Sequence, residues 1–213
     1  VQEISHKTLK EEAERIAAGL VKQGLEPGQT VAIMLPTSCD YFYSFFGVLF
    51  ARGIPVPIYP PARMSQIEDH LQRHTRILQN SQVRILITVK EAKTLSRLLQ
   101  LRLPSLQSIM TVSELRSPVQ PIQVGVAESS DIAFLQYTSG STGNPKGVTL
   151  THANLLANVR AMGQAVQASS TDICVSWLPV YHDMGLIGAW LGSLYHAMPL
   201  VIMSPLQFLS KPQ

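Results

Sequence analysis

An alternation of short apolar runs with segments of helix length is the feature that most constrains how this chain can fold. The run TVAIML, which begins at Thr30, is almost entirely apolar, as is typical of a strand buried on both faces of a parallel sheet. The segment DYFYSFFGVLFARG that follows has the length of a helix, and IPVPIY then returns to strand character. This order predicts an α/β fold with largely parallel sheets flanked by helices.

The alternation extends in both directions along the chain. A helix is expected from Thr8, because Thr8 and Glu11 have the spacing of a capping box and Gly24 supplies an end signal. Further expected elements before residue 116 are a helix over 64–80, a strand at 84–88, a helix around 93–101 and a short strand at 108–112. Beyond residue 130 we expect strands at 132–139 and 147–152, a helix over 154–167, and strands at 173–179 and 199–204.

The stretch RSPVQPIQVGVAESS, residues 116–130, interrupts this pattern. It contains two prolines and has no regular period, so it is predicted to be a surface connection. It divides the chain into an N-terminal α/β lobe, residues 1–115, and a second α/β lobe, residues 131–213. Because the chain begins at Val1 rather than at a methionine and ends in FLSKPQ, we interpret it as a segment of a longer protein.

Composition limits the class of protein. Charged residues make up 15% of the chain, against about 25% for an ordinary soluble domain, so part of the surface is expected to be covered by further protein. The net charge of +3 comes without dense basic runs, and we therefore predict no nucleic-acid partner. The longest apolar run, Tyr41–Ala51, is shorter than the roughly 20 residues that span a bilayer, so no stable membrane insertion is predicted.

The two cysteines, Cys39 and Cys174, have neither CxxC nor metal-ligand spacing. They are predicted to be reduced, buried thiols, which places the protein in the cytoplasm. No disulfide framework is implied.

The most polar and most flexible segment of the chain is YTSGSTGNPKGV, which starts at Tyr137. Its glycines allow main-chain N–H groups to approach a ligand, its hydroxyl side chains add donors, and Lys146 adds a positive charge. A Walker A loop that began at Gly140 would need glycine where this chain has Pro145, and a strand rather than a helix is expected to follow. The residues alone leave two possibilities, a flexible connection without a task and a cradle for an oligophosphate.

Residues 137–147, with the LTHANL segment that follows, closely resemble the phosphate-binding signature of the adenylate-forming superfamily, [YF]TSG[ST]TGxPKG followed by THxN. The resemblance covers essentially the whole chain and implies the N-terminal portion of that family's large domain. It implies ATP and Mg²⁺ as cofactors, with the β- and γ-phosphates held while a substrate carboxylate attacks the α-phosphorus. By resemblance, Lys146 has a catalytic role and Thr138 is also a candidate metal ligand. The nucleotide would be bound by Thr138, Ser139, Gly140, Ser141, Thr142, Gly143 and Lys146.

A second group of candidate residues lies in WLPVYHDMGLIG, where Tyr181, His182 and Asp183 follow an apolar strand. A lone histidine here is most often structural, and a His-Asp pair can also suggest a metal site, although no further ligand cluster accompanies it. In the adenylate-forming family an aromatic-His pair at this place lines the acyl pocket. The resemblance therefore implies that Tyr181 and His182 bind substrate and that His182 takes part in catalysis.

The YHDMGLIG string, the YPPAR segment at 59–63 and the MSPLQFL segment at 203–209 look most like the fatty acyl-AMP ligase branch. That branch activates a fatty acid and passes the acyl group to the phosphopantetheine arm of an acyl carrier protein, often for polyketide or lipopeptide assembly. The adenine, ribose and C-terminal catalytic sites would lie beyond residue 213, so residues 1–213 alone are expected to be inactive. The alternatives are a long- or medium-chain acyl-CoA synthetase and a non-catalytic nucleotide-binding or scaffolding segment.

Three further features receive structural interpretations. His152 is expected to support a strand-to-helix turn with Thr151 as N-cap, a catalytic role being the alternative. The basic helix over 64–80 is expected to be a solvated face, with contact to an acidic carrier protein as the alternative. The aromatic residues of 41–50 are expected to form core.

Overall fold

The computed structural model describes residues 2–59, 67–116, 126–138 and 145–210. The chain forms two compact units, each described here by itself. Unit 1 comprises residues 1–127 and 132–149, and unit 2 comprises residues 128–131 and 150–213. Unit 1 contains, in chain order, α1 (His6–Lys22), β1 (Thr30–Met34), α2 (Cys39–Phe50), β2 (Ile54–Pro57), α3 (Ile67–Asn80), β3 (Ile85–Thr88), α4 (Lys90–Gln100), β4 (Ser108–Met110), α5 (Val112–Leu115), β5 (Ile132–Thr138) and the first part of β6 (Lys146–Thr151).

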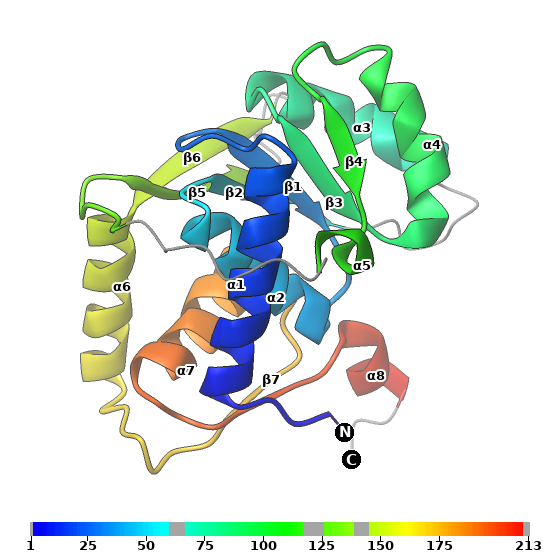
Figure 1. The fold of residues 1–213 in the computed structure, drawn as a ribbon. Helices are drawn as coiled ribbons and strands as arrows, with labels where there is room; N and C mark the ends of the chain where they lie inside the picture. Colours follow the sequence, from blue (N-terminus) through cyan, green and yellow to red (C-terminus); the bar gives the residue numbers. More distant parts are fainter. Residues whose placement is uncertain (1, 60–66, 117–125, 139–144, 211–213) are drawn as a thin grey trace. The chain divides into compact units, whose positions relative to one another are not determined.

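A parallel sheet with strand order β2-β1-β3-β4 is the centre of unit 1 (Figure 1). Its register pairs Ala32 of β1 with Val56 of β2 and with Leu86 of β3, and Leu86 with Ile109 of β4. The helices α2, α3 and α4 connect successive strands. The fold class expected from the alternation of apolar runs and helical segments is therefore confirmed.

One face of this sheet is covered by α3 and α4. Ala32 and Met34 of β1 and Leu86 of β3 are buried there together with residues of both helices. The members of this cluster from the two helices and the loops that follow them are Leu78, Val83, Ala92, Leu99, Leu103 and Leu106. Because side chains alternate along a strand, Val31 and Ile33 point to the opposite face, and both are fully buried.

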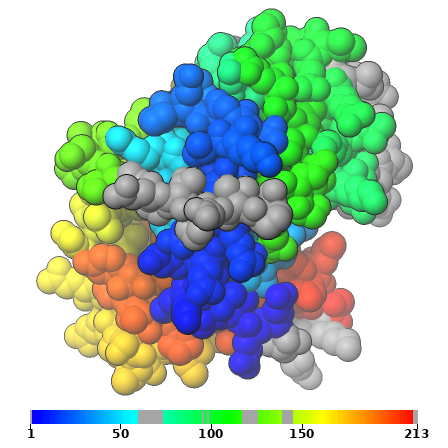
Figure 2. Space-filling view, in the orientation of Figure 1, coloured from blue at the N-terminus to red at the C-terminus, as the bar shows by residue number. Residues whose placement is uncertain are grey.

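The helices α1 and α2 lie side by side in Figure 1 and pack against each other. Their close approach depends on Gly47, where an added Cβ would lie 2.6 Å from Cγ2 of Ile16. Tyr41 and Phe45 of α2 are fully buried, which confirms the aromatic segment as core. The space-filling view shows α1, in dark blue, at the surface, where its polar residues are exposed (Figure 2).

The beginning of α1 differs from the expectation. The N-cap is Ser5, whose hydroxyl accepts a hydrogen bond from the Thr8 backbone N–H, so the helix starts one turn earlier than the Thr8–Glu11 spacing indicated. Gly24 does occupy the left-handed region expected of a helix end, with φ of 82°. A second difference is α5, a capped turn of helix that begins at Val112, inside the expected strand over 108–112.

The boundary between the units also differs from the expected division into residues 1–115 and 131–213. Residues 132–149, which contain β5, group with unit 1. The physical reason is that β5 contacts β2, and its Leu135 and Tyr137 pack against the buried cluster under α3 and α4. Residues 117–125, most of the expected connection, lie outside the described residues.

Unit 2 contains the rest of β6, α6 (His152–Ala165), β7 (Cys174–Ser176), η2 (Met184–Leu191), α7 (Gly192–Tyr195), β8 (Leu200–Ile202) and α8 (Pro205–Ser210). The strands β7 and β8 pair in parallel, with Val175 opposite Val201. The η2 segment is a π-helix, which no pattern in the sequence predicted. Such segments are rare and occur frequently at functional sites.

The structure also bears on the predicted burial of the cysteines and on membrane insertion. Both cysteines are free, but they are half-buried rather than buried. Within the part of the chain that the structure describes, no helix has the length and apolar character needed to cross a bilayer.

Candidate functional site

The two ends of the expected phosphate loop are defined by a pair of neighbouring strands. Thr138 is the last residue of β5, Lys146 is the first residue of β6, and the two strands are hydrogen-bonded to each other. Both side chains are exposed. The loop residues between them lie outside the described residues, namely Ser139, Gly140, Ser141, Thr142 and Gly143.

This pair of strand ends has chemistry that fits a nucleotide phosphate. The Thr138 hydroxyl can donate a hydrogen bond, and the Lys146 ammonium is a compact positive charge of the kind that binds phosphate. Magnesium that accompanies a nucleotide takes only one or two protein ligands and fills its other positions with phosphate oxygens and water. Among the described residues no group of three His, Cys, Asp or Glu side chains could hold a metal. The Thr138 hydroxyl could serve as the single protein ligand of a magnesium ion that arrives with the nucleotide.

The residue before Thr138 anchors this part of β5. The Tyr137 ring lies against Gly147 of β6, where an added Cβ would stand 2.9 Å from Cζ of Tyr137. The Tyr137 hydroxyl donates a hydrogen bond to Oδ1 of Asn80, the last residue of α3. Burial raises the pKa of Tyr137 above its ordinary value, and the Ser81 side chain opposes this shift. Sequence reasoning missed Asn80, because it is 57 residues away in sequence.

The turn from β6 into α6 is as expected. Thr151 is the N-cap of α6, and its hydroxyl accepts a hydrogen bond from the Asn154 backbone N–H, while Asn154 Oδ1 accepts from the Thr151 N–H and hydroxyl. His152 is the first residue of the helix, and its backbone N–H donates to the Asp131 carbonyl oxygen. This geometry supports the structural interpretation of His152.

The second group of candidate residues belongs to unit 2 and precedes η2. Asp183 is the N-cap of η2, and its Oδ1 accepts a hydrogen bond from the Met184 backbone N–H at 2.8 Å. The His182 backbone N–H donates to the Pro179 carbonyl oxygen. Gly185 is required beside this turn, because an added Cβ would collide with the Pro179 carbonyl. The turn is therefore held by backbone hydrogen bonds and by the Asp183 side chain.

The side chain of His182 is available to a ligand. It is 73% exposed, and its Nδ1 lies 3.6 Å from Oδ1 of Asp183. The Tyr181 and His182 rings are neighbours, with centroids 6.4 Å apart. An exposed imidazole is unlike the buried, hydrogen-bonded structural histidine that was one alternative. The His-Asp pair also lacks the further ligands that a metal site would need among the described residues.

An aromatic contact that sequence reasoning missed lies on the chain just before this turn. The Trp177 ring stacks on Phe208 of α8, with centroids 4.1 Å apart and an interplanar angle of 6°. The contact fixes the MSPLQFL segment to the end of β7. The two strings had been noted separately, and nothing in their spacing indicated that they meet.

Comparison with known proteins gives a consistent picture. The family model described as "AMP-binding enzyme" matches residues 1–213. The chain is 35% identical to the long-chain-fatty-acid–AMP ligase FadD32 of Mycolicibacterium smegmatis over 203 residues, which cover 93% of this chain and 31% of the relative. It is 32% identical to the medium-chain-fatty-acid–[acyl-carrier-protein] ligase TtuA of Teredinibacter turnerae, over 99% of this chain and 38% of the relative. The chain thus spans about a third of the length of these curated relatives.

Solved structures agree. A structure from a study of fatty acyl-adenylate ligases of E. coli and L. pneumophila matches with a TM-score of 0.91 and 31% identity, over 100% of this chain and 38% of that one. A fatty acyl-adenylate ligase of L. pneumophila in complex with acyl adenylate and pyrophosphate matches with a TM-score of 0.81 and 34% identity, over 99% and 36%. With the signature at 137–147 in sequence and its two ends on paired strands, this chain belongs to the AMP-binding enzyme family, and its relatives include fatty acyl-AMP ligases.

Proposed function

We propose that the protein activates a fatty acid with ATP, forming an acyl-adenylate and pyrophosphate, and then transfers the acyl group to the phosphopantetheine arm of an acyl carrier protein. The observation that carries the proposal is the complete signature at 137–147, together with the exposure of Thr138 and Lys146 on neighbouring strands. The relatives named as fatty-acid–AMP ligases support the substrate class.

The adenylation step needs no nucleophilic side chain. A carboxylate oxygen of the fatty acid forms a bond to the α-phosphorus, and the bond from that phosphorus to the pyrophosphate oxygen breaks. Negative charge accumulates on the leaving pyrophosphate, and donors fixed in advance stabilise such charge most effectively. In this proposal Lys146 neutralises that charge, and the Thr138 hydroxyl donates to a phosphate oxygen or ligates the magnesium that the nucleotide brings.

The proposal also assigns the remaining candidate residues. The backbone N–H groups and hydroxyls of Ser139, Gly140, Ser141, Thr142 and Gly143 would hold the β- and γ-phosphates. Tyr181 and His182 would line the acyl pocket close to the reacting carboxylate. The exposure of the His182 side chain supports a ligand-facing role for this residue.

Two relatives support a carrier protein as acceptor rather than coenzyme A. TtuA of Teredinibacter turnerae and JamA of Moorena producens are both named as medium-chain-fatty-acid–[acyl-carrier-protein] ligases. They are 32% and 31% identical to this chain.

The test uses the protein as encoded by its gene, one radiolabelled fatty acid, ATP and Mg²⁺, with holo acyl carrier protein or coenzyme A as acceptor. We expect fatty-acid-dependent release of pyrophosphate and efficient loading of the holo carrier protein. The apo carrier protein, which lacks the phosphopantetheine thiol, is the matched control and should not be loaded. Efficient formation of acyl-CoA without loading of the carrier would assign the protein to the acyl-CoA synthetases instead. Absence of pyrophosphate release with any fatty acid would favour a non-catalytic nucleotide-binding segment.

A further inference from the structure

Asn80 and Gly147 hold Tyr137 from two sides. The Tyr137 hydroxyl donates a hydrogen bond of 2.5 Å to Asn80 Oδ1. The ring of Tyr137 fills the space over Gly147, where Cζ and the hydroxyl oxygen would stand 2.9 Å and 3.1 Å from an added Cβ. Any side chain other than hydrogen at position 147 would therefore have to displace the tyrosine ring, because real Cβ atoms essentially never approach another atom within 3.0 Å.

The acceptor Asn80 stands on a fixed support. It is the last residue of α3, and the chain turns sharply after it. The Ser81 hydroxyl donates to the Ile77 carbonyl oxygen at 2.6 Å, and the Ser81 carbonyl accepts from the Thr30 hydroxyl at 2.7 Å. Thr30 begins β1, an inner strand of the parallel sheet. The hydrogen bond to Tyr137 therefore connects β5 to the end of a helix that is itself tied to the sheet.

The residues that follow these contacts are the two described ends of the phosphate-binding segment. Thr138 is next to Tyr137 on β5, and Lys146 is next to Gly147 on the neighbouring strand β6. Both side chains are exposed, and within the described residues neither forms a side-chain hydrogen bond or an ion pair. Their placement therefore depends on the residues immediately behind them.

We propose that the hydrogen bond from Tyr137 to Asn80, together with the packing of the tyrosine ring on Gly147, positions Thr138 and Lys146 to bind the phosphates of ATP. Tyr137 and Asn80 are positioning residues and touch no substrate. The inference rests on the proposed function and adds to it a connection between the phosphate-binding strands and α3.

The chemistry of residue 137 allows the two contacts to be separated. Phenylalanine would keep the ring over Gly147 and remove the hydroxyl, and with it the hydrogen bond to Asn80. A tyrosine hydroxyl is protonated at neutral pH, and burial raises the pKa of Tyr137 further above its ordinary value, so the hydroxyl can donate throughout the range of an ordinary assay. At position 80, aspartate would keep an acceptor oxygen of the same reach, whereas leucine of similar size would remove it.

The test measures fatty-acid-dependent exchange of pyrophosphate into ATP by the encoded protein and its variants, over a range of ATP concentrations. We expect Tyr137→Phe and Asn80→Leu each to raise KM for ATP about fivefold, the effect of losing one typical hydrogen bond. Asn80→Asp should retain most of the affinity for ATP, because the aspartate keeps an acceptor oxygen. The double variant Tyr137→Phe/Asn80→Leu should have the same KM as either single variant, because each substitution removes the same hydrogen bond. Tyr195→Phe is the matched control, since its hydroxyl accepts from Arg160 Nε in unit 2, and should leave KM unchanged.

Thermal unfolding separates positioning from general destabilisation. We expect Tyr137→Phe and Asn80→Leu to raise KM for ATP while their melting temperatures stay close to that of the unmodified protein. An unchanged KM in Tyr137→Phe would overturn the inference. If the unmodified protein shows no exchange of pyrophosphate into ATP, the proposed function has failed. Amide hydrogen exchange then tests the inference by itself. Faster exchange at the facing ends of β5 and β6 in Tyr137→Phe, with the remaining strands unchanged, would support it, and unchanged exchange there would refute it.

Discussion

Glu114 is the residue whose ionisation is most strongly tied to the fold of unit 1. Its carboxylate accepts hydrogen bonds from Lys93 Nζ, from the Thr111 backbone N–H at 2.8 Å and from the Thr111 hydroxyl at 2.9 Å. The Lys93 hydrogen bond, followed by the Thr111 backbone bond, lowers the pKa of Glu114 to about 2. A carboxyl with a lowered pKa in the folded state stabilises the fold above its ordinary pKa of 4.5, and this contribution is lost as the pH falls toward 2.

Glu114→Gln is therefore expected to lower the free energy of unfolding at pH 7 by about 1 kcal/mol, a modest value because the side chain is 43% exposed and partly screened. The difference from the unmodified chain should shrink as the pH is lowered from the ordinary carboxyl pKa. Urea unfolding at several pH values measures it. Glu11→Gln, which removes an exposed carboxylate 3.9 Å from Lys7, is the control and should change little at any pH. A difference for Glu114→Gln that is constant with pH would contradict the assignment.

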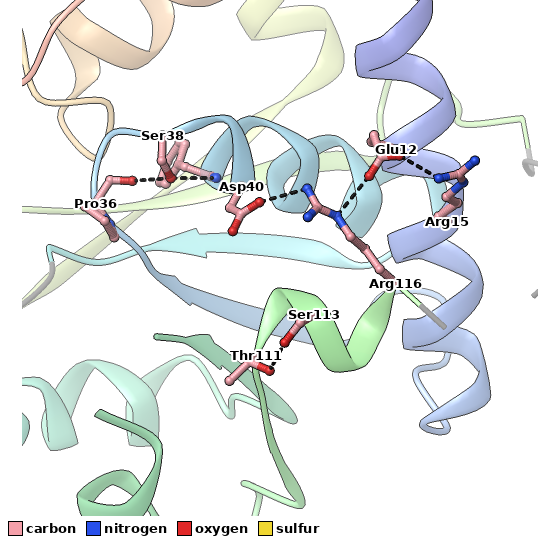
Figure 3. A network of polar contacts seen from close by, with 9 residues as sticks. Glu12, Arg15, Pro36, Ser38, Asp40, Thr111, Ser113 and Arg116 are labelled. Atoms are coloured by element: carbon pink, nitrogen blue, oxygen red, sulfur yellow. Dashed lines mark hydrogen bonds and ion pairs between the residues drawn. The ribbon is translucent and has the colours of Figure 1, made fainter. Parts of the chain in front are cut away.

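At the scale of elements, Arg116 joins three helices of unit 1. From the end of α5 it forms ion pairs with Glu12 of α1 at 2.9 Å and with Asp40 of α2 at 2.8 Å (Figure 3). Its guanidinium also lies 5.2 Å from the centroid of the Tyr43 ring. Glu12 is largely buried, with 18% of its side chain exposed, and it is also paired with Arg15 of its own helix, so Arg116 supplies the ion pair that connects Glu12 to another element.

Arg116→Ala is expected to destabilise the chain by about 1–3 kcal/mol, because it removes the ion pairs to the largely buried Glu12 and to Asp40. Arg116→Lys should recover only part of this, because one ammonium cannot serve both carboxylates with the geometry of a planar guanidinium. Denaturant unfolding measures both variants, with Arg15→Ala as a control, since Arg15 contacts only Glu12 on its own helix. Equal stability of the lysine variant and the unmodified chain would mean that charge alone matters.

Most elements could be predicted from the sequence, because local patterns determine them. The apolar run at Thr30 became β1, and the threonine before α6 became its N-cap. One error was local: α1 starts at the earlier cap Ser5, whose hydroxyl accepts a hydrogen bond from the Thr8 N–H. Another arose from a tertiary contact, because β5 belongs to unit 1 through its packing beside β2.

The candidate site could be predicted only in part, for the same reason. The signature is a contiguous string, so the sequence alone could nominate Thr138 and Lys146 as candidates. Asn80 contacts Tyr137 across 57 residues, and the Trp177–Phe208 stack likewise joins distant segments, so neither pair has a local signal. Gly185 of the π-helix η2 lies against the Pro179 carbonyl, where an added Cβ would collide with it. No periodicity in the sequence reveals this contact.

At the scale of the whole molecule, unit 2 leaves large apolar side chains exposed. Val175 and Val201, opposite each other on β7 and β8, are 57% and 47% exposed. Leu206 and Leu209 of α8 are 75% and 74% exposed. Contiguous exposed apolar surface favours association.

Residues 1–213 expressed alone are therefore expected to self-associate. They are also expected to show no turnover of ATP with a fatty acid, because they span about a third of the length of the curated relatives. Sedimentation velocity over a range of concentrations measures the first, and pyrophosphate release the second. Val175→Lys should weaken the association, and Val126→Lys, at an exposed valine of unit 1, is the matched control. A monomer at all concentrations, or repeated turnover by this chain alone, would contradict the expectation.

The central claim is that a fatty acid carboxylate attacks the α-phosphorus of ATP while Lys146 neutralises the leaving pyrophosphate. In the most direct test, the encoded protein receives ATP, Mg²⁺, holo acyl carrier protein and a fatty acid. The fatty acid carries oxygen-18 in both carboxyl oxygens, and the products are analysed by mass spectrometry. The account predicts AMP with one labelled oxygen, unlabelled pyrophosphate, and slower AMP formation by Lys146→Ala than by the control Lys22→Ala at the exposed end of α1. Unlabelled AMP, label in pyrophosphate or orthophosphate, or an unchanged rate in Lys146→Ala would contradict it.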